Sequence, residues 1–357
     1  MMKRNKMRLT TVVLSLVLLV IVLFSPPRTP PIKDAEGRIL PDSIAEIEQV
    51  VLGGVKQSIL IRGADRSKPV LLFLHGGPGY PQIAFARKYQ QELERFFVVV
   101  NWDQRGSGQS YHFDLTADDM QVSRLIEDTH ELTRLLQQRF GQSKIFLAGH
   151  SWGSLLGTWT VQKYPDLYYA YIGIGQVADQ LQGEKKSYEF VLSEAYRRNN
   201  RKAISELESI GAPPYRNPRK DTTLQRKWVA EFGGSERLIR SGSDLLKGIF
   251  LSPEYNGWDG IRLAFGNSFS AKTILAQTEH TNLLETASEL QVPVFIAMGR
   301  HDYMTPSEVA YSYYENLRAP SKQFVWFEQS AHFPHFEEQD RFTEWMIEIK
   351  KTIMEAG

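Results

Sequence analysis

The sequence of 357 residues contains no cysteine. This absence excludes disulfide bonds, thiolate metal sites, a cysteine nucleophile and a lipid-modified cysteine. The chain also lacks a long basic run, and because its formal net charge is only +1, nucleic acid is not an expected partner. No His-Glu-x-x-His motif, EF-hand loop or GxxxxGK phosphate loop is present, so we expect neither a metal ion nor another cofactor.

One long apolar run is present, near the N-terminus, at Leu9–Phe24. Its length lies between that of a signal-peptide core and that of a full membrane span. Prolines and an arginine follow it where a signal peptidase needs small residues, so residues 1–25 are predicted to be an uncleaved membrane anchor. A cleaved signal peptide, which would leave a secreted protein, is the alternative. Four basic residues precede the run and predict a single-pass protein whose body lies on the extracytoplasmic side: Lys3, Arg4, Lys6 and Arg8.

A proline-rich linker, residues 26–44, separates this segment from a long alternation of strand-like and helix-like segments. The alternation covers residues 45–177, stops over the polar and largely helical residues 178–290, and resumes over residues 291–357. It predicts a mainly parallel sheet with helices on both faces, interrupted by an inserted helical cap. Helical spacing also predicts a helix up to residue 140 that Gly141 ends. The predicted strands are residues 57–63, 69–75, 97–103, 144–150, 168–176, 292–299 and 322–328.

The pentapeptide GHSWG, Gly149–Gly153, matches the G-x-S-x-G pattern of a nucleophile elbow. It stands between a predicted strand and a predicted helix, which is the context that the motif requires. Glycines two residues to either side of Ser151 leave room for a sharp turn that lifts its hydroxyl above the sheet. Ser151 is therefore the predicted nucleophile.

A serine hydroxyl needs a base to remove its proton, and the base needs a carboxylate to orient it. Asp302 and His332 follow two late predicted strands, at the sheet edge where sites in α/β folds gather. They are the predicted acid and base. His335 is an alternative base, and Asp179 is an alternative acid. Two further histidines are expected to have structural roles: His150 and His301.

The segment LFLHGGPGY, residues 72–80, places three glycines and a proline directly after a predicted strand. Attack by Ser151 would create a negative charge on the substrate oxygen, and backbone amides must be ready to bind it. Gly77 is one predicted donor, because its missing side chain lets the oxygen reach the amide, and Trp152 is the other. The alternative is that this segment is only a tight turn.

These motifs, together with DQRGSGQS at residues 103–110 and the late GRHD and SAHF segments, resemble the prolyl aminopeptidase (proline iminopeptidase) branch of the α/β-hydrolases. The resemblance implies a mostly parallel eight-stranded sheet with a helical cap. It implies a serine hydrolase that releases an N-terminal residue, of the proline type, from small peptides through an acyl-enzyme. The implied residues are those predicted above: Ser151, Asp302, His332, Gly77 and Trp152. Asp103 and Arg105 would brace the loops around the site.

Two features depart from that family's pattern. His150 stands where such enzymes usually have glycine, and the cap glutamates that bind the substrate's free amino group have no clear match. Glu231 and Glu254 are the candidates for that role. The alternative functions are an esterase or amidase for small acyl substrates, and a small-molecule receptor of the same fold that does not turn its ligand over.

Overall fold

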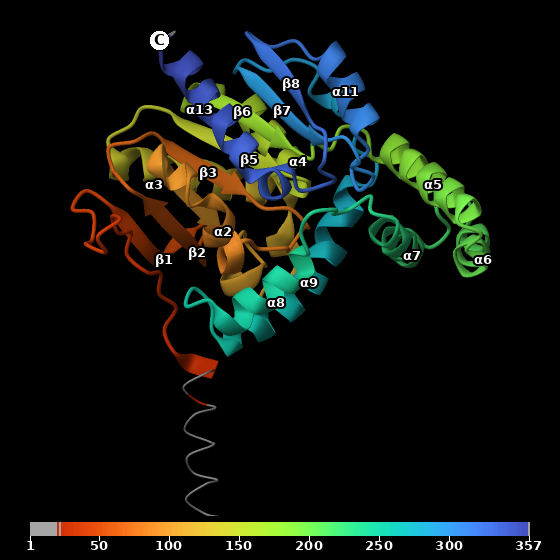
Figure 1. The fold of residues 1–357 in the computed structure, drawn as a ribbon, viewed down its shortest axis with the longest axis horizontal. Helices are drawn as coiled ribbons and strands as arrows, with labels where there is room; N and C mark the ends of the chain where they lie inside the picture. The colour runs from red at the N-terminus through yellow and green to blue at the C-terminus, as the bar shows by residue number, and fades with distance from the viewer. Residues whose placement is uncertain (1–19, 21–22, 356–357) are drawn as a thin grey trace, which may run out of the picture.

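The structure, a computed structural model, describes residue 20 and residues 23–355 (Figure 1). The predicted membrane anchor, residues 1–25, lies almost wholly outside the described residues. Within the described part of the chain, no helix combines the length and the apolar character needed to cross a bilayer.

An eight-stranded sheet forms the centre of the fold, in the order β1-β2-β4-β3-β5-β6-β7-β8 (Figure 1). The two pairings made by β2 are antiparallel and all others are parallel, so the predicted mostly parallel eight-stranded sheet is confirmed. The strands are β1 (Ile44–Leu52), β2 (Val55–Gly63), β3 (Val70–Leu74), β4 (Val98–Trp102), β5 (Ile145–His150), β6 (Tyr168–Ile174), β7 (Val294–Gly299) and β8 (Lys322–Phe327).

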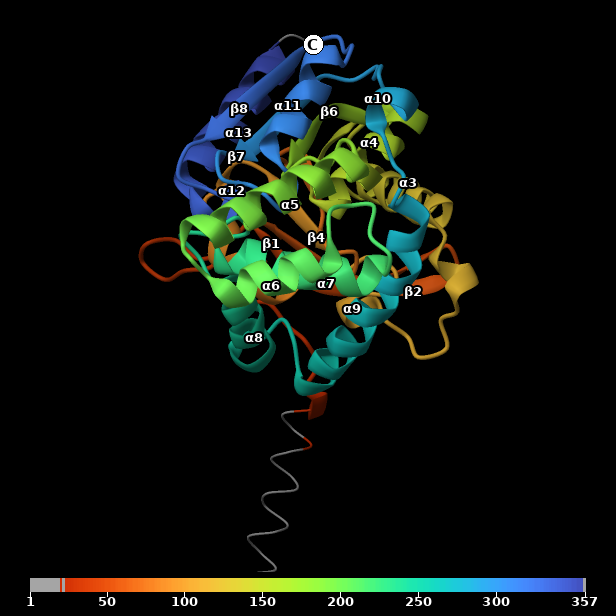
Figure 2. The ribbon, with the colours of Figure 1, turned by 90° about the vertical axis from the view of Figure 1, so that its right-hand side faces the viewer.

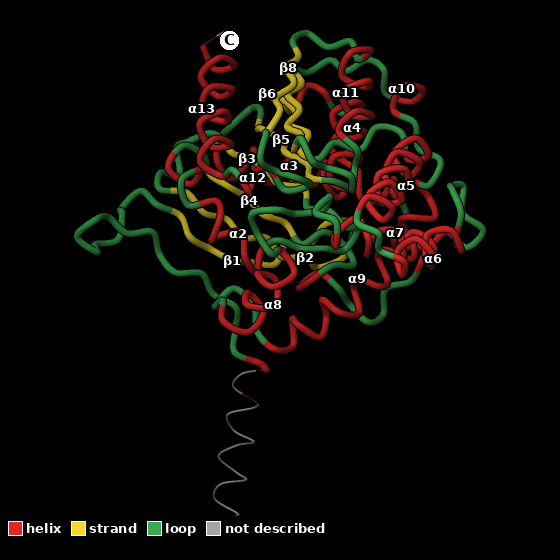
Figure 3. The backbone as a smooth tube through the Cα atoms, turned by 45° about the vertical axis from the view of Figure 1, so that its right-hand side comes forward, coloured by secondary structure: helices red, strands yellow, loops and turns green. Residues whose placement is uncertain are grey.

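Helices cover both faces of the sheet. Alternate residues of a strand face opposite sides, so one strand supplies apolar side chains to both faces. Leu72 and Leu74 join one apolar cluster with α3, α4 and α11, whereas Leu71 and Phe73 join another with α13. Figure 3 shows the strands enclosed by these helices. Gly141 ends α3 in the left-handed conformation, as predicted. The helices outside the cap are α2 (Ile83–Gln90), α3 (Val122–Phe140), α4 (Trp152–Lys163), α10 (Leu283–Thr286), α11 (Ser307–Asn316), α12 (Pro334–Glu337) and α13 (Gln339–Glu355).

Of the six helices between β6 and β7, the first five form the group that we call the cap helices (Figure 2). Three of them, α5 to α7, share an apolar cluster of their own that includes Val191, Leu207 and Trp228. The fourth, α8, packs on α2 through Leu245 and Ile249. The domain boundaries drawn from the sequence stay a prediction. The cap helices are α5 (Gln180–Arg197), α6 (Arg201–Ile210), α7 (Pro218–Glu231), α8 (Ser241–Leu251) and α9 (Gly257–Thr278).

The proline-rich segment lies against the body and does not stand clear of it as a spacer. We call residues 24–31 the N-terminal strap. Its Arg28 amide donates to the Pro253 carbonyl at 2.8 Å, and the Thr29 hydroxyl donates to Glu254 at 2.9 Å. Arg62 donates to Thr29 and to the Pro30 carbonyl, at 2.6 and 2.7 Å. Prolines keep their carbonyl acceptors although they lack an amide donor, so a proline-rich segment can still be held by donors from the body.

Candidate active site

Ser151 stands between the end of β5 and the beginning of α4, with φ 56° and ψ −121°. A positive φ is uncommon for a residue with a side chain and persists only where the surroundings impose it. The Ser151 amide donates to the Ile174 carbonyl of β6 at 2.9 Å, which fixes the turn to the neighbouring strand. The sharp turn expected of a nucleophile elbow is therefore present.

The two glycines of the elbow are required by close backbone contacts. A Cβ atom on Gly149 would lie 2.2 Å from the Gly153 carbonyl oxygen. A Cβ atom on Gly153 would lie 2.1 Å from the Leu74 carbonyl oxygen of β3. Both contacts are with backbone atoms that cannot rotate away, so the turn places α4 directly against β3.

Replacing Gly153 with alanine is expected to destabilise the fold by about 3 kcal/mol or more, because a methyl group would overlap a strand carbonyl. Urea unfolding measures this loss. The matched control is Gly242→Ala in the first turn of α8, where an added Cβ meets nothing within 4 Å. The control should lose no stability, and equal stability of the two variants would contradict the tight packing of the elbow.

Asp302 and His332 are buried together in the loops that follow β7 and β8. The His332 Nδ1 atom lies 2.8 Å from Asp302 Oδ2. The other carboxylate oxygen accepts the backbone amides of Met304 and Thr305, both at 2.9 Å, and the Thr305 hydroxyl donates to Oδ2 at 2.8 Å. The carboxylate is thus fixed by its own loop, and it holds the imidazole by Nδ1, while Nε2 bonds to none of the described residues.

His332 lies beside the elbow that carries Ser151. Its ring is 4.7 Å from that of His150, and His150 Nε2 donates to the His332 carbonyl at 2.8 Å. Among the described residues, no hydrogen bond joins the Ser151 hydroxyl to the His332 ring. Such bonds are often long without substrate and tighten only when it binds. The structure therefore gathers Ser151, Asp302 and His332 at the carboxyl ends of β5, β7 and β8.

The alternative acid and base occupy other positions. Asp179 caps α5 by accepting the Gln182 amide at 2.9 Å, and it contacts no histidine that the structure describes. His335 is buried in α12, and neither of its ring nitrogens has a hydrogen-bond partner among the described residues. His301 follows β7, where its amide donates to the Ser330 carbonyl. Asp302 is therefore the carboxylate that contacts His332.

Burial of His335 gives the protein a sensitivity to acid. Burial, and to a smaller extent His332, holds the pKa of His335 well below the usual 6.5. The unfolded chain takes up a proton at this residue as the pH falls below about 6.5, whereas the folded chain does not. The contribution to stability is therefore complete above pH 6.5 and is lost as the pH falls below it.

Replacing His335 with phenylalanine is expected to weaken the acid destabilisation by about 1.4 kcal/mol per pH unit below pH 6, the value for one proton. Urea unfolding of both proteins between pH 7.5 and 5 measures the difference. His280, whose side chain is 89% exposed, provides the control variant His280→Gln. An identical pH dependence in wild type and His335→Phe would contradict the expectation.

His75, the first residue of the HGGPG loop, is held in one neutral form. The Gln104 amide donates to His75 Nε2 at 3.1 Å, so Nδ1 carries the proton and donates to the Gly76 carbonyl at 2.8 Å. Burial lowers the pKa of His75 to about 4, which keeps the ring neutral at physiological pH. The neutral ring therefore joins the HGGPG loop to the loop after β4.

Gln104 extends this connection to the elbow. Its side chain donates to the His75 carbonyl at 2.9 Å and accepts the indole N–H of Trp152 at 2.9 Å. Among the described residues, neither the Gly77 amide nor the Trp152 amide donates a hydrogen bond. A Cβ atom on Gly76 would lie only 3.0 Å from the Ser151 Cβ, so the loop passes close to the predicted nucleophile. Two free backbone donors and a serine thus lie in one braced unit.

Asp103 and Arg105 of DQRGSGQS, for which the resemblance implies a bracing role, both bond to other parts of the body. Asp103 accepts the Gln109 amide at 2.9 Å and the Tyr255 hydroxyl, and its burial raises its pKa to about 7. Arg105 makes two bonds of 2.7 Å to Asp128 on α3, and both side chains are buried. These contacts fix the loop after β4 to Tyr255, just before α9, and to α3.

The two candidate amino-binding glutamates have different surroundings. Glu254 is 1% exposed, and its carboxylate is occupied by Arg87 at 2.7 Å, by Thr29 and by Ser252. It therefore joins α2, the N-terminal strap and the loop after α8. Glu231 is an exposed residue at the end of α7, and no hydrogen bond or ion pair joins it to another described residue.

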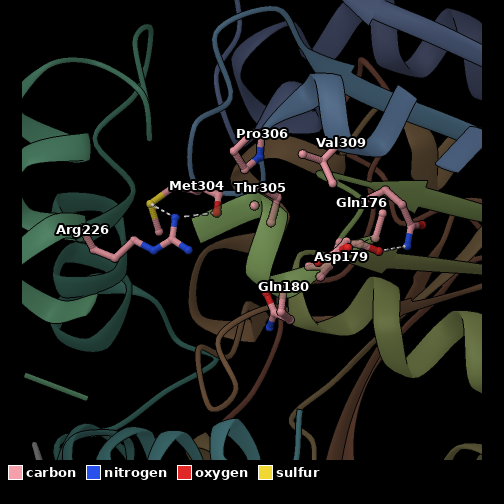
Figure 4. Close-up of a pocket in the computed structure, with 11 residues that line it drawn as sticks. Gln176, Asp179, Gln180, Arg226, Met304, Thr305, Pro306 and Val309 are labelled. Atoms are coloured by element: carbon pink, nitrogen blue, oxygen red, sulfur yellow. Dashed lines mark hydrogen bonds between the residues drawn. The ribbon is translucent and has the colours of Figure 1, made fainter. Parts of the chain in front are cut away.

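Arg226 of α7, a residue that the sequence did not single out, connects the cap helices to the loop that carries Asp302 (Figure 4). Its guanidinium donates to the Met304 carbonyl at 2.5 Å and to the Tyr303 carbonyl at 3.2 Å. It also pairs with Glu184 of α5 at 2.5 Å. Arg226 and the Asp302 loop line a small pocket, together with Gln176, Val177, Ala178, Asp179, Gln180, Gly183 and Val309.

Replacing Arg226 with methionine is expected to lower kcat by about tenfold to a hundredfold, because the loop that holds Asp302 loses its support from the cap. KM and kcat for a chromogenic ester separate this effect from weaker substrate binding. Arg219→Met is the matched control, since Arg219 lies on the same helix and is exposed, and its side chain bonds to Ser268 alone among the residues that the structure describes. Equal kcat values for the two variants would contradict a role for Arg226 in positioning the acid.

Comparison with known proteins agrees with this geometry. The family model described as the alpha/beta hydrolase fold matches residues 69–339. A probable aminopeptidase, YbaC of Bacillus subtilis, is 37% identical over 84% of this chain and 94% of its own length. A proline iminopeptidase of Clostridioides difficile is 26% identical over 81% of this chain and 92% of its own. The crystal structure of proline iminopeptidase from Mycobacterium smegmatis superposes with a TM-score of 0.64 at 16% identity, covering 87% of this chain and 100% of that one. The chain therefore belongs to the α/β-hydrolase family, among relatives named aminopeptidase and proline iminopeptidase.

Proposed function

We propose that this protein is a serine hydrolase that releases the N-terminal residue from small peptides, with Ser151, His332 and Asp302 as its catalytic residues. The observation that carries the proposal is the 2.8 Å contact between His332 and Asp302, placed beside an elbow serine and two unpaired backbone amides. The names of the relatives support an aminopeptidase as the specific activity.

The geometry supports acyl transfer in two steps. His332 takes the Ser151 proton on Nε2 while Nδ1 stays bonded to Asp302, and the serine oxygen attacks the substrate carbonyl. The amides of Gly77 and Trp152 bind the oxygen that becomes negative. His332 then gives its proton to the leaving amine, and a water molecule, activated by the same base, releases the acyl group.

The positions of Glu254 and Glu231 favour a second candidate, an esterase or amidase for small acyl substrates. An aminopeptidase must bind a free amino group, but the Glu254 carboxylate is already bonded to Arg87, and Glu231 is an exposed residue at the end of α7. The third candidate, a small-molecule receptor of the same fold, would bind its ligand without turning it over.

The test compares prolyl and alanyl p-nitroanilides with their N-acetylated forms and with short-chain p-nitrophenyl esters. The full chain is used, because the N-terminal strap contacts the cap through Glu254. Faster cleavage of the free-amino substrates, absent in Ser151→Ala, would support the aminopeptidase. Turnover of esters alone, or indifference to acetylation, would support the second candidate, and binding without turnover would overturn both.

We also propose, from the sequence of residues 1–25 alone, that the protein is held at a membrane with its body on the extracytoplasmic side. N-terminal sequencing of the protein isolated from its source tests the anchor. A mature chain that begins near residue 25 would contradict it and indicate a cleaved signal peptide.

A further inference from the structure

Exposed aromatic rings gather where the chain enters the folded body. Phe24, Phe113 and Phe265 are 57%, 55% and 57% exposed. Together with Trp258 their rings form a continuous row. The centroid distances are 6.1 Å from Phe24 to Trp258, 5.8 Å from Trp258 to Phe113 and 5.6 Å from Phe113 to Phe265. Single exposed apolar side chains are ordinary, but a continuous group of them marks an interaction surface. We call these four residues, with Ile261, the aromatic face.

Three residues of the aromatic face lie on one side of α9. Trp258, Ile261 and Phe265 are spaced at i, i+3 and i+7, which places them on a single helical face. The opposite side packs on the body, where the Ser270 hydroxyl donates to the Gly106 carbonyl at 2.8 Å. A Cβ atom on Gly266 would lie 2.7 Å from that same oxygen. The helix is thus held firmly from behind while its apolar side faces outward.

The N-terminal strap places the first residues of the folded body beside the aromatic face. The Ser25 carbonyl accepts the Asn256 side chain at 2.8 Å, one residue before α9 begins, and Phe24 contacts Trp258. Figure 2 shows the first described residues meeting the body at this end of α9. The residues that precede Phe24 include an apolar run from Leu9 without a single charged side chain, preceded by four basic residues.

We propose that the aromatic face rests in the interfacial region of a lipid bilayer. The uncharged apolar run would enter the lipid, and the strap is too short and too well bonded to let the body turn its aromatic face away. Aromatic side chains are favoured where an apolar layer meets water, and apolar helix faces bind there in proportion to the area they bury. This contact is made by the folded body; it rests on the membrane attachment proposed above and is independent of the proposed hydrolase activity.

The experiment measures tryptophan quenching by lipids brominated on their acyl chains. The full chain is reconstituted in vesicles of phosphatidylcholine and phosphatidylglycerol, with and without the bromolipids. Comparison with Trp258→Phe isolates the emission of Trp258 from that of the other six of the seven tryptophans. We expect bromolipids to remove most of the emission of Trp258. Trp228→Phe is the matched control, because Trp228 is buried among α5 to α7 and its replacement should leave the quenched emission unchanged.

A second variant distinguishes contact between the aromatic face and lipid from attachment through the N-terminal run alone. Phe113→Ser combined with Phe265→Ser keeps the N-terminal run and alters only exposed side chains, so it should fold, as circular dichroism can check. We expect it to restore much of the Trp258 emission. Unchanged quenching in this variant would mean that attachment alone brings Trp258 near lipid and would overturn the proposal. Equal quenching of wild type and Trp258→Phe would also overturn the proposal, because lipid would then not reach Trp258. In that case a second copy or the chain's own first residues would cover the aromatic face.

Discussion

Replacing Ser151 with alanine is expected to lower kcat by roughly 10⁴- to 10⁶-fold on every substrate that the wild type cleaves. Without the hydroxyl no acyl-enzyme forms, and only binding and the two backbone amides remain to assist water. Alanine retains the Cβ atom, so the backbone at φ 56° experiences no new strain and the fold should persist. Initial rates and a thermal unfolding curve measure the two quantities together.

Ser154, in the same turn, provides the matched control. Its hydroxyl donates to the Ser151 carbonyl at 2.6 Å and accepts the Val177 amide at 3.0 Å. Ser154→Ala should therefore lose about 1 to 3 kcal/mol of stability, since it leaves a buried amide unpaired, while it keeps most of its activity. Activity of Ser151→Ala within tenfold of the wild type would show that another residue is the nucleophile.

Replacing Asp302 with asparagine is expected to lower kcat by about 10⁴-fold. The asparagine oxygen can still accept the Met304 and Thr305 amides, so the loop keeps its shape. Its NH₂ group would then face His332 Nδ1 and donate to it, which leaves the proton on Nε2. A ring in that form cannot take the proton of Ser151.

The pH profile of kcat/KM and the residual rate test this expectation. Asp179→Asn is the matched control, because Asp179 was the alternative acid and caps α5 away from His332. The control should remain within a few-fold of the wild type. A larger loss in Asp179→Asn than in Asp302→Asn would reverse the assignment of the acid.

The sequence predicts best those parts of the molecule that depend on neighbouring residues. All strands except β1 follow from apolar runs in the sequence, and the elbow follows from two glycines at fixed spacing. β1 is an edge strand whose sequence, IAEIEQVVL, mixes acidic and apolar residues because much of it faces solvent. Its pairing with β2 gives it order without an apolar run.

Contacts between distant parts of the chain could not be predicted in this way. Arg226 meets Met304 across 78 residues, and Thr29 meets Glu254 across 225. Glu254 was considered for substrate binding because it is an acid in the cap, yet its role depends on Arg87 and the N-terminal strap. The neutral form of His75 likewise depends on an amide from Gln104, 29 residues further along. A charged residue's partner is set by the tertiary fold, which local patterns do not contain.

The separate apolar cluster of α5 to α7 makes this part of the chain a module. Most of their apolar contacts are with one another, and they reach the loop that carries Asp302 through Arg226, through Ser187 and through the stacking of Phe190 on Tyr303 at 3.7 Å. Such a unit can diverge, lengthen or be exchanged while the sheet and its elbow stay the same. Differences in substrate preference among related chains are therefore expected to correlate with sequence changes in these three helices more closely than with changes in the sheet.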